Sequence, residues 1–204
     1  MRTRRSKGTR RSAKEARALS WAPSEWMLPQ TRTESVYARR SWTPANNRGV
    51  MLTLDLMAAL VRDPSSTLRA EAASIASGVP PDAFPLVLRE WLAAHVVQEA
   101  DPYNVELVRS PDWSLAIIQE RGQVAGDCDD VATLGAAIGL AAGFLVRFVV
   151  LAWGETYSHV YAEIQAPGPP PIWYELDIHR PPAGEAPAPD RELVVYPGRA
   201  TTPD

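Results

Sequence analysis

Apolar residues recur at helical spacing in the first part of the chain after its N-terminal 48 residues. In residues 51–61, Leu, Met and Val recur three and four positions apart, which predicts an amphipathic helix. Residues 65–67 are capping types, and they predict a second helix that runs to about residue 76. A third helix is expected over residues 81–98, where the apolar positions again share one face.

The pattern changes in the second half. Residues 128–142 predict a helix that ends at Gly143. Prolines at 102 and 111 indicate an irregular segment over residues 101–113. Strands are expected where β-branched and aromatic residues form short runs, at residues 144–153, 157–165, 172–177 and 192–196. Helices followed by an antiparallel sheet indicate the α+β class.

Charge and composition divide the chain into three parts. Residues 1–48 hold twelve Arg and Lys against three Glu, a net charge of +9. Residues 49–204 hold nine Arg against twenty-one Asp and Glu, a net charge of −12. We expect residues 1–48 to be a basic, largely disordered or irregular extension. Residues 49–180 are expected to form the domain that carries the chemistry, and residues 181–204 a Pro-rich segment with an edge strand.

The basic extension admits three interpretations. It is a solvated tail, or an upstream extension of a reading frame that starts at Met27 or Met51, or an arm that contacts nucleic acid weakly through phosphates. The first two are preferred. The basic residues precede no apolar core of the signal-peptide kind, and no run approaches the ~18 apolar residues of a membrane helix.

The only cysteine lies where a helix is expected to begin. One cysteine excludes an intrachain disulfide and a cysteine-rich zinc site, and it suits a reducing, cytoplasmic setting. Backbone N–H groups in the first turn of a helix have no intrahelical partner, and the helix dipole is positive there. Both effects favour a thiolate at Cys128, and the same N–H groups suit an oxyanion. The residues that follow it at helical spacing are small, which predicts close packing on a sheet: Ala132, Gly135, Ala136 and Gly139.

Three aspartates surround this thiol. Asp127, Asp129 and Asp130 are expected to cap the helix, because carboxylates bond the unpaired N–H groups there. Their negative charge should raise the pKa of the thiol, so a protonated histidine has to outweigh them. The run lacks the glycine and the distant glutamate of a calcium loop, so we expect capping and no metal.

A thiol nucleophile needs a base within hydrogen-bond reach, and the base needs an orienting group. The chain has three histidines. His95 lies on the apolar face of a predicted helix and is expected to be a core residue. His179 follows the third strand and is the weaker candidate. His159 lies within a strand and is the predicted base.

A hairpin supplies the orienting group. If residues 157–165 and 172–177 pair about Gly168, the numbers of opposed residues sum to 336, and His159 faces Asp177. Opposed side chains have Cβ atoms about 5 Å apart, which suits a carboxylate that holds an imidazole. A slip of one residue would break this pairing. Without a cysteine at a helix start, the His159–Asp177 pair would be interpreted as an exposed polar contact between two strands.

Five sequence blocks fall in the order of cysteine, histidine and aspartate between residues 101 and 177. They are Gly-Asp-Cys-Asp-Asp at 126–130, the small-residue helix, Val-Arg-Phe at 146–148, Ser-His-Val-Tyr-Ala-Glu at 158–163 and Trp-Tyr-Glu-Leu-Asp at 173–177. Together these blocks resemble the transglutaminase-like family of the papain-like cysteine enzymes, which has the same order. The aspartate-rich block, with the Asp-Pro at 101–102 and the Ser-Pro at 110–111, also resembles phage and prophage-encoded members.

The resemblance implies a papain-like fold in which N-terminal helices and the cysteine-bearing helix pack on an antiparallel sheet. It implies three catalytic roles: Cys128 as nucleophile, His159 as base and Asp177 as the residue that orients the base. It implies no metal and no organic cofactor.

The family's second oxyanion donor is a side chain that precedes the cysteine. Gln123, Gln119 and Trp113 are the candidates. Tyr161 and Trp173 are candidates for lining a substrate cleft, with core packing as an equal alternative.

The function expected from these residues is cysteine-dependent acyl transfer on a peptide or carboxamide. Release of the acyl group to water gives a peptidase or amidase, and release to an amine gives a transamidase. The partner is then a peptide or protein substrate, with no membrane, in the cytoplasm or in a virion. The alternative is a catalytically silent scaffold that serves as a phage structural or assembly protein.

Overall fold

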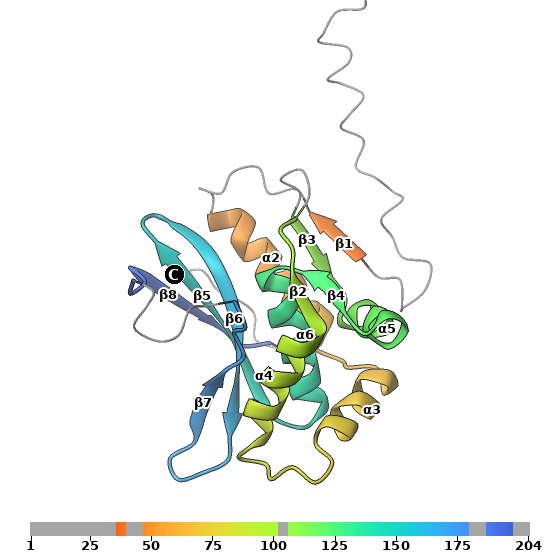
Figure 1. Ribbon diagram of the computed structural model, residues 1–204. Coiled ribbons are helices and arrows are strands. Elements are labelled where there is room, and N and C mark those ends of the chain that lie inside the picture. Colours follow the sequence, from red (N-terminus) through yellow and green to blue (C-terminus); the bar gives the residue numbers. More distant parts are fainter. Residues whose placement is uncertain (1–35, 40–46, 102–105, 180–186, 198–204) are drawn as a thin grey trace, which may run out of the picture.

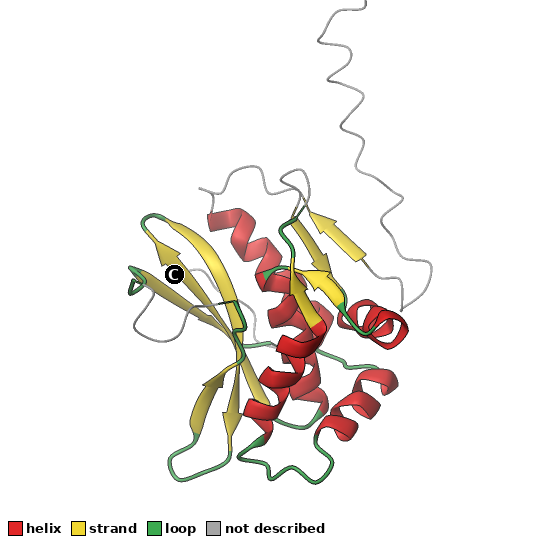
Figure 2. Cartoon of the chain, viewed as in Figure 1, coloured by secondary structure: helices red, strands yellow, loops and turns green. Residues whose placement is uncertain are grey.

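The computed structural model describes residues 36–39, 47–101, 106–179 and 187–197. A four-stranded antiparallel sheet forms one side of the molecule, and the helices lie on the other (Figures 1 and 2). Its strand order is β7-β6-β5-β8. The predicted α+β class is confirmed. The strands are β5 (Leu145–Trp153), β6 (Thr156–Ala166), β7 (Ile172–Glu175) and β8 (Arg191–Val195).

Within the described residues there are five helices. The Ser65 hydroxyl caps α3 by accepting a hydrogen bond from the Leu68 N–H at 3.1 Å, as its residue type predicts. Helix α6 lies between the sheet and the other helices, which explains why most of its residues are buried. The helices are α2 (Asn47–Val61), α3 (Ser66–Ile75), α4 (Phe84–His95), α5 (Pro111–Arg121) and α6 (Cys128–Ala141).

The small residues of α6 lie against large ones, as the sequence predicts. A Cβ atom added at Gly139 would lie 2.6 Å from Ile164 Cδ1 on β6 and 3.1 Å from Val146 Cγ2 on β5. A Cβ at Gly135 would lie 3.0 Å from Leu92 Cδ1 and 3.1 Å from Leu176 Cδ1. Helix α6 is therefore held at a distance from the sheet that larger side chains would not allow.

Replacing Gly139 with alanine should destabilise the protein, although alanine favours helices. The helix-propensity gain is at most ~1 kcal/mol, whereas overpacking a core costs about 1–3 kcal/mol. Urea unfolding of Gly139→Ala measures the difference. Adding Ile164→Val removes the Cδ1 atom that the new methyl meets, so the double variant should lose less stability than the two single losses combined. Strict additivity would contradict this packing.

The structure corrects the predicted elements between residues 96 and 126. The third helix ends at His95 rather than at residue 98, and β2 (Val96–Gln98) follows it at once. It pairs in parallel with β4 (Val124–Gly126). The segment expected to be irregular contains β3 (Glu106–Arg109) and the start of α5. Ser110 caps that helix and Pro111 occupies its first turn, where a missing N–H costs nothing, so Pro111 starts a helix here.

Strand β1 (Val36–Arg39) pairs antiparallel with β3, so part of the stretch expected to be irregular before residue 48 is a strand. Most of the expected basic extension and much of the expected Pro-rich C-terminal segment lie outside the described residues. The fourth predicted strand is confirmed as β8 at the edge of the sheet. No helix in the described part of the chain is both long and apolar enough to cross a membrane.

The predicted register of the β6–β7 hairpin is wrong by two positions. Glu163 pairs with Glu175 and Ala166 with Ile172, so opposed numbers sum to 338 instead of 336. The hairpin is therefore centred on residue 169. Because side chains alternate with a period of two, a shift of two leaves every side chain on its predicted face.

Candidate active site

Cys128 is the first residue of α6, and Asp127 at the N-cap connects it to β4. The side chain is half-buried against the main core. Gly126 is required at the end of β4, because a Cβ there would lie 2.8 Å from both Cβ and Oδ2 of Asp130. Helix α6 packs against β6, the strand that carries His159.

Asp130 is tied to Arg109 on β3. The Arg109 N–H donates to Asp130 Oδ1 at 2.8 Å, and the Arg109 guanidinium Nη1 forms an ion pair with Oδ2. The N–H of Asp127 donates to the same Oδ2 at 3.4 Å, so the capping role is confirmed for Asp130. Arg109 offsets a negative charge two residues from the thiol. The sequence did not indicate this role of Arg109, because the residues of β3 were expected to be irregular.

Asp129 is buried with no partner that would favour its ionised form. It is 3% exposed, and neither of its carboxyl oxygens has a hydrogen-bond donor among the described residues. Burial raises the pKa of Asp129 well above 3.8, and the carboxyl groups of Asp127 and Asp130 raise it further. Burial and these neighbours therefore favour the neutral form of the Asp129 carboxyl. The predicted opposition of three aspartates to the thiolate is smaller than their number suggests, because the charge of Asp129 is disfavoured and that of Asp130 is paired with Arg109.

The structure brings His159 and Asp177 together as predicted. His159 Nε2 is hydrogen-bonded to Asp177 Oδ2, and the His179 N–H donates to Asp177 Oδ1 at 2.8 Å. Arg89 Nε on α4 donates to the Asp177 carbonyl oxygen at 2.9 Å, which ties this turn to the helical layer. Asp177 is only 3% exposed. Asp177 lies two residues past the end of β7, and continuing the β6–β7 register to that point makes the two residues diagonal neighbours on one face.

The hydrogen bond determines what each imidazole nitrogen of His159 can do. Asp177 engages Nε2. The other nitrogen, Nδ1, is the one left to exchange a proton with a thiol or a leaving group. A carboxylate on one nitrogen also stabilises the imidazolium that such an exchange produces.

His179 links this pair to the start of α6. Burial lowers the pKa of the His179 imidazole, Asp177 and Asp127 raise it, and His159 lowers it. These three groups are thus close enough to act electrostatically on one imidazole. Since Asp127 directly precedes Cys128, the start of α6 and the His159–Asp177 pair both lie within electrostatic range of the His179 imidazole.

Among the predicted oxyanion donors, Gln123 points away from Cys128. Gln123 Nε2 donates to the Ala94 carbonyl at 3.1 Å, at the far end of β4 from Cys128. Five extended residues span roughly 16 Å, which is beyond the reach of a glutamine side chain. Gln119 is exposed on α5, and half-buried Trp113 lies 5.8 Å from the Arg109 guanidinium carbon, so both stay predictions. The first turn of α6 supplies N–H groups without an intrahelical partner, which suit an oxyanion.

The two predicted cleft residues have packing roles. Tyr161 is 6% exposed in a small cluster with Val149 and Leu151, and its ring centroid lies 6.1 Å from that of His159. Trp173 lies under the Arg147 guanidinium, whose carbon is 4.2 Å from the indole centroid. Tyr161 thus supports the position of His159 from the side.

His95 has a hydrogen-bond partner as a structural residue would, but it is half-buried rather than in the core as expected. Its Nδ1 lies 2.8 Å from the Trp91 carbonyl oxygen, and its ring stacks on the indole of Trp91 at 4.5 Å. This imidazole on α4 therefore serves as a control residue for experiments on His159.

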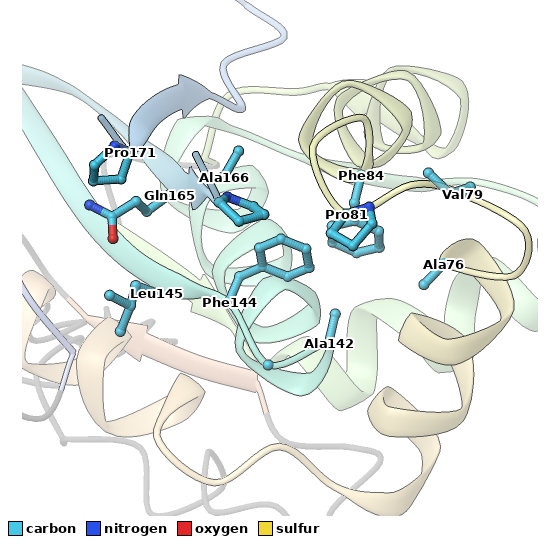
Figure 3. A pocket seen from close by; sticks show the side chains of 12 residues that line it. Ala76, Val79, Pro81, Phe84, Ala142, Phe144, Leu145, Gln165, Ala166 and Pro171 are labelled. Carbon is cyan, nitrogen blue, oxygen red and sulfur yellow. The ribbon is translucent and has the colours of Figure 1, made fainter. Parts of the chain in front are cut away.

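An apolar pocket of about 490 Å³ lies at the other end of α6. Figure 3 shows Phe84 and Phe144 among the side chains that line it, and their rings stack with centroids 4.8 Å apart. Ala142 and Gly143 line it, and the fourteen residues of α6 span ~21 Å from Cys128 to this end. The pocket is therefore separate from the cysteine.

We compared the chain with protein-family models, with curated protein sequences and with solved structures. No family model matched, and neither of the other two searches gave a significant match.

Proposed function

We propose that this protein catalyses cysteine-dependent acyl transfer on a peptide or carboxamide, with Cys128 as nucleophile, His159 as base and Asp177 as the orienting residue. The observation that carries the proposal is the hydrogen bond between His159 on β6 and Asp177 in the turn after β7, where β6 packs against the helix that begins at Cys128. A papain-like, transglutaminase-like fold is part of the proposal. The helix-on-sheet arrangement supports it.

The reaction follows from these groups. The Cys128 thiolate attacks the carbonyl carbon, a C–S bond forms, and the carbonyl electrons move to oxygen. N–H groups in the first turn of α6 stabilise that oxyanion. The His159 imidazolium donates its Nδ1 proton to the leaving nitrogen, the C–N bond breaks, and a thioester remains.

The thioester is resolved by a second nucleophile. His159, now neutral, removes a proton from water or from an amine as it attacks. Water yields a carboxylic acid, and an amine yields a new amide. The sulfur leaves as a thiolate, and the proton on His159 restores the starting pair.

Trapping the acyl-enzyme tests the proposal. The full-length protein is incubated with peptides that carry a glutamine carboxamide and with a peptide library, then quenched in acid and weighed intact. We expect a mass increase equal to the mass of the substrate minus that of its leaving amine, reversed by hydroxylamine and absent in Cys128→Ala. Adding a small primary amine separates the two outcomes, because transamidation alone builds the amine into the product.

A scaffold is the competing function. It predicts no adduct with any substrate and a Cys128 that reacts with iodoacetamide at the rate of an unstructured cysteine peptide. Both results together would overturn the proposed activity.

A further inference from the structure

Four aspartates meet at the start of α6, from two distant parts of the chain. Asp127, Asp129 and Asp130 belong to the cysteine segment, and Asp101 follows β2, about 26 residues earlier. One carboxylate oxygen from each of Asp101, Asp127 and Asp130 lies within 4.8 Å of the other two. Ligand oxygens on opposite sides of a calcium ion are about 4.6–5.2 Å apart, so this spacing fits ligands of one ion.

The described protein groups leave part of this cluster unsatisfied. Asp101 Oδ2 accepts a hydrogen bond from the Leu107 N–H, but Asp101 Oδ1 is shielded from solvent and has no partner among the described residues. The same holds for Asp127 Oδ1. An isolated carboxylate oxygen is costly to bury unless a hydrogen-bond donor or a cation meets it.

Asp129 provides an independent indication. Its side chain is almost fully buried, both its oxygens lack a donor within the described part of the chain, and its carboxyl lies against that of Asp127. Helix capping does not require this residue, because Asp130 already receives the Asp127 N–H. Its two oxygens are therefore buried acceptors beside the cluster that no donor among the described residues satisfies.

The only cation that the described residues place on the cluster is Arg109. It engages both oxygens of Asp130, and within the described residues it forms no hydrogen bond or ion pair with Asp101 or Asp127. Taking Asp101, Asp127 and Asp130 as ionised, Arg109 leaves two negative charges. A divalent ion would balance these charges, and the donors are all oxygens, which hard cations prefer.

We propose that Asp101, Asp127 and Asp130 form a binding site for one hard divalent cation of the Ca²⁺ or Mg²⁺ class. The ion joins the segment after β2 to the N-terminus of α6 and so fixes the start of the cysteine helix.

The test uses the full-length protein after chelator treatment and dialysis. Ca²⁺ and Mg²⁺ are titrated separately by calorimetry, and Tb³⁺ is titrated with indole excitation. Trp113 is a suitable sensitiser, because it lies beside the Arg109 that bonds Asp130. We expect saturable binding of one ion, and a rise in Tm of about 5 °C or more at a hundredfold excess over Kd.

Asp101→Asn and Asp127→Asn should each weaken binding at least tenfold. Asp82→Asn, an exposed aspartate in the turn before α4, should bind like the wild type. Cys128→Ala should also bind normally, which separates this proposal from the acyl-transfer proposal. The site is overturned if no ion saturates up to millimolar concentration, or if both aspartate variants bind and melt like the wild type.

Discussion

Replacing His159 with alanine is expected to slow the alkylation of Cys128 by iodoacetamide about 10- to 100-fold at about pH 6, because only the thiolate reacts and an unassisted thiol with a pKa near 8.5 is almost wholly protonated there. In the proposed pair, the imidazolium of His159 stabilises the thiolate. Its Nε2 is held by Asp177, so the ring keeps its orientation in the folded protein.

The alkylation rate should be measured from about pH 5 to 9. The wild-type profile should show substantial reactivity on the acid side, and His159→Ala should retain only the rise of an ordinary thiol. The alkylation rates of Asp177→Asn should lie between those of the wild type and His159→Ala. The amide still accepts the His179 N–H, but it no longer carries the charge that stabilises an imidazolium.

His95→Ala is the matched control. That imidazole is engaged with Trp91 on α4, so its removal should leave the profile unchanged. Identical profiles for the wild type and His159→Ala would exclude a thiolate–imidazolium pair at this site.

Replacing Asp129 with asparagine is expected to raise the free energy of unfolding by about 1–3 kcal/mol at about pH 8, because burying an ionised carboxylate without a partner is costly. Asparagine has nearly the same shape and stays neutral. At about pH 4 the gain should be much smaller, because the wild-type carboxyl is then protonated in the folded protein.

The pH dependence follows from proton uptake. The pKa of Asp129 is higher in the folded protein than its ordinary value of 3.8, so the folded state binds the proton more tightly. Its stabilising contribution is complete below about pH 4 and is lost as the pH rises through the folded-state value. Asp101, with a pKa of about 6, and Asp130, with a pKa of about 7, act in the same direction.

Urea unfolding of the wild type in chelator should therefore show a free energy of unfolding that falls as the pH rises from about 4 to 7. In a protein whose carboxylates are paired with cations, this free energy rises over the same range. Asp129→Asn should flatten this fall, and Asp82→Asn should reproduce the wild-type curve. If Asp129→Asn changed the free energy of unfolding equally at about pH 4 and about pH 8, the raised pKa of Asp129 in the folded protein would be contradicted.

The sequence predicted the site best where it depends on periodicity. The small face of α6 is confirmed by Gly139 against Ile164, and a period of two put His159 and Asp177 on one face despite the wrong register. Side chains alternate with a period of two, so an error of two residues in the register leaves them on the same face. This is why the predicted His159–Asp177 contact is present although the predicted register is wrong.

What the sequence did not predict depends on contacts between distant segments. The strands β2 and β4 have three residues each, which is too short for a periodic signal, and they pair across residues 99–123. Arg109 could not be assigned to Asp130 without β3, and Asp101 joins the other aspartates only through the β2–β4 pairing. The charge balance around Cys128 is thus a property of the tertiary structure.

The pairing of β1 with β3 limits how far the protein can be shortened from its N-terminus. Val36 to Arg39 cover one side of the strand that delivers Arg109 to Asp130. A truncated variant that starts at Met51 would leave β3 without its strand partner, and an unpaired strand invites pairing with another chain and aggregation. A variant that starts just before Val36 removes nine of the twelve Arg and Lys of residues 1–48 and keeps β3 paired, so expression and crystallisation trials are better begun there.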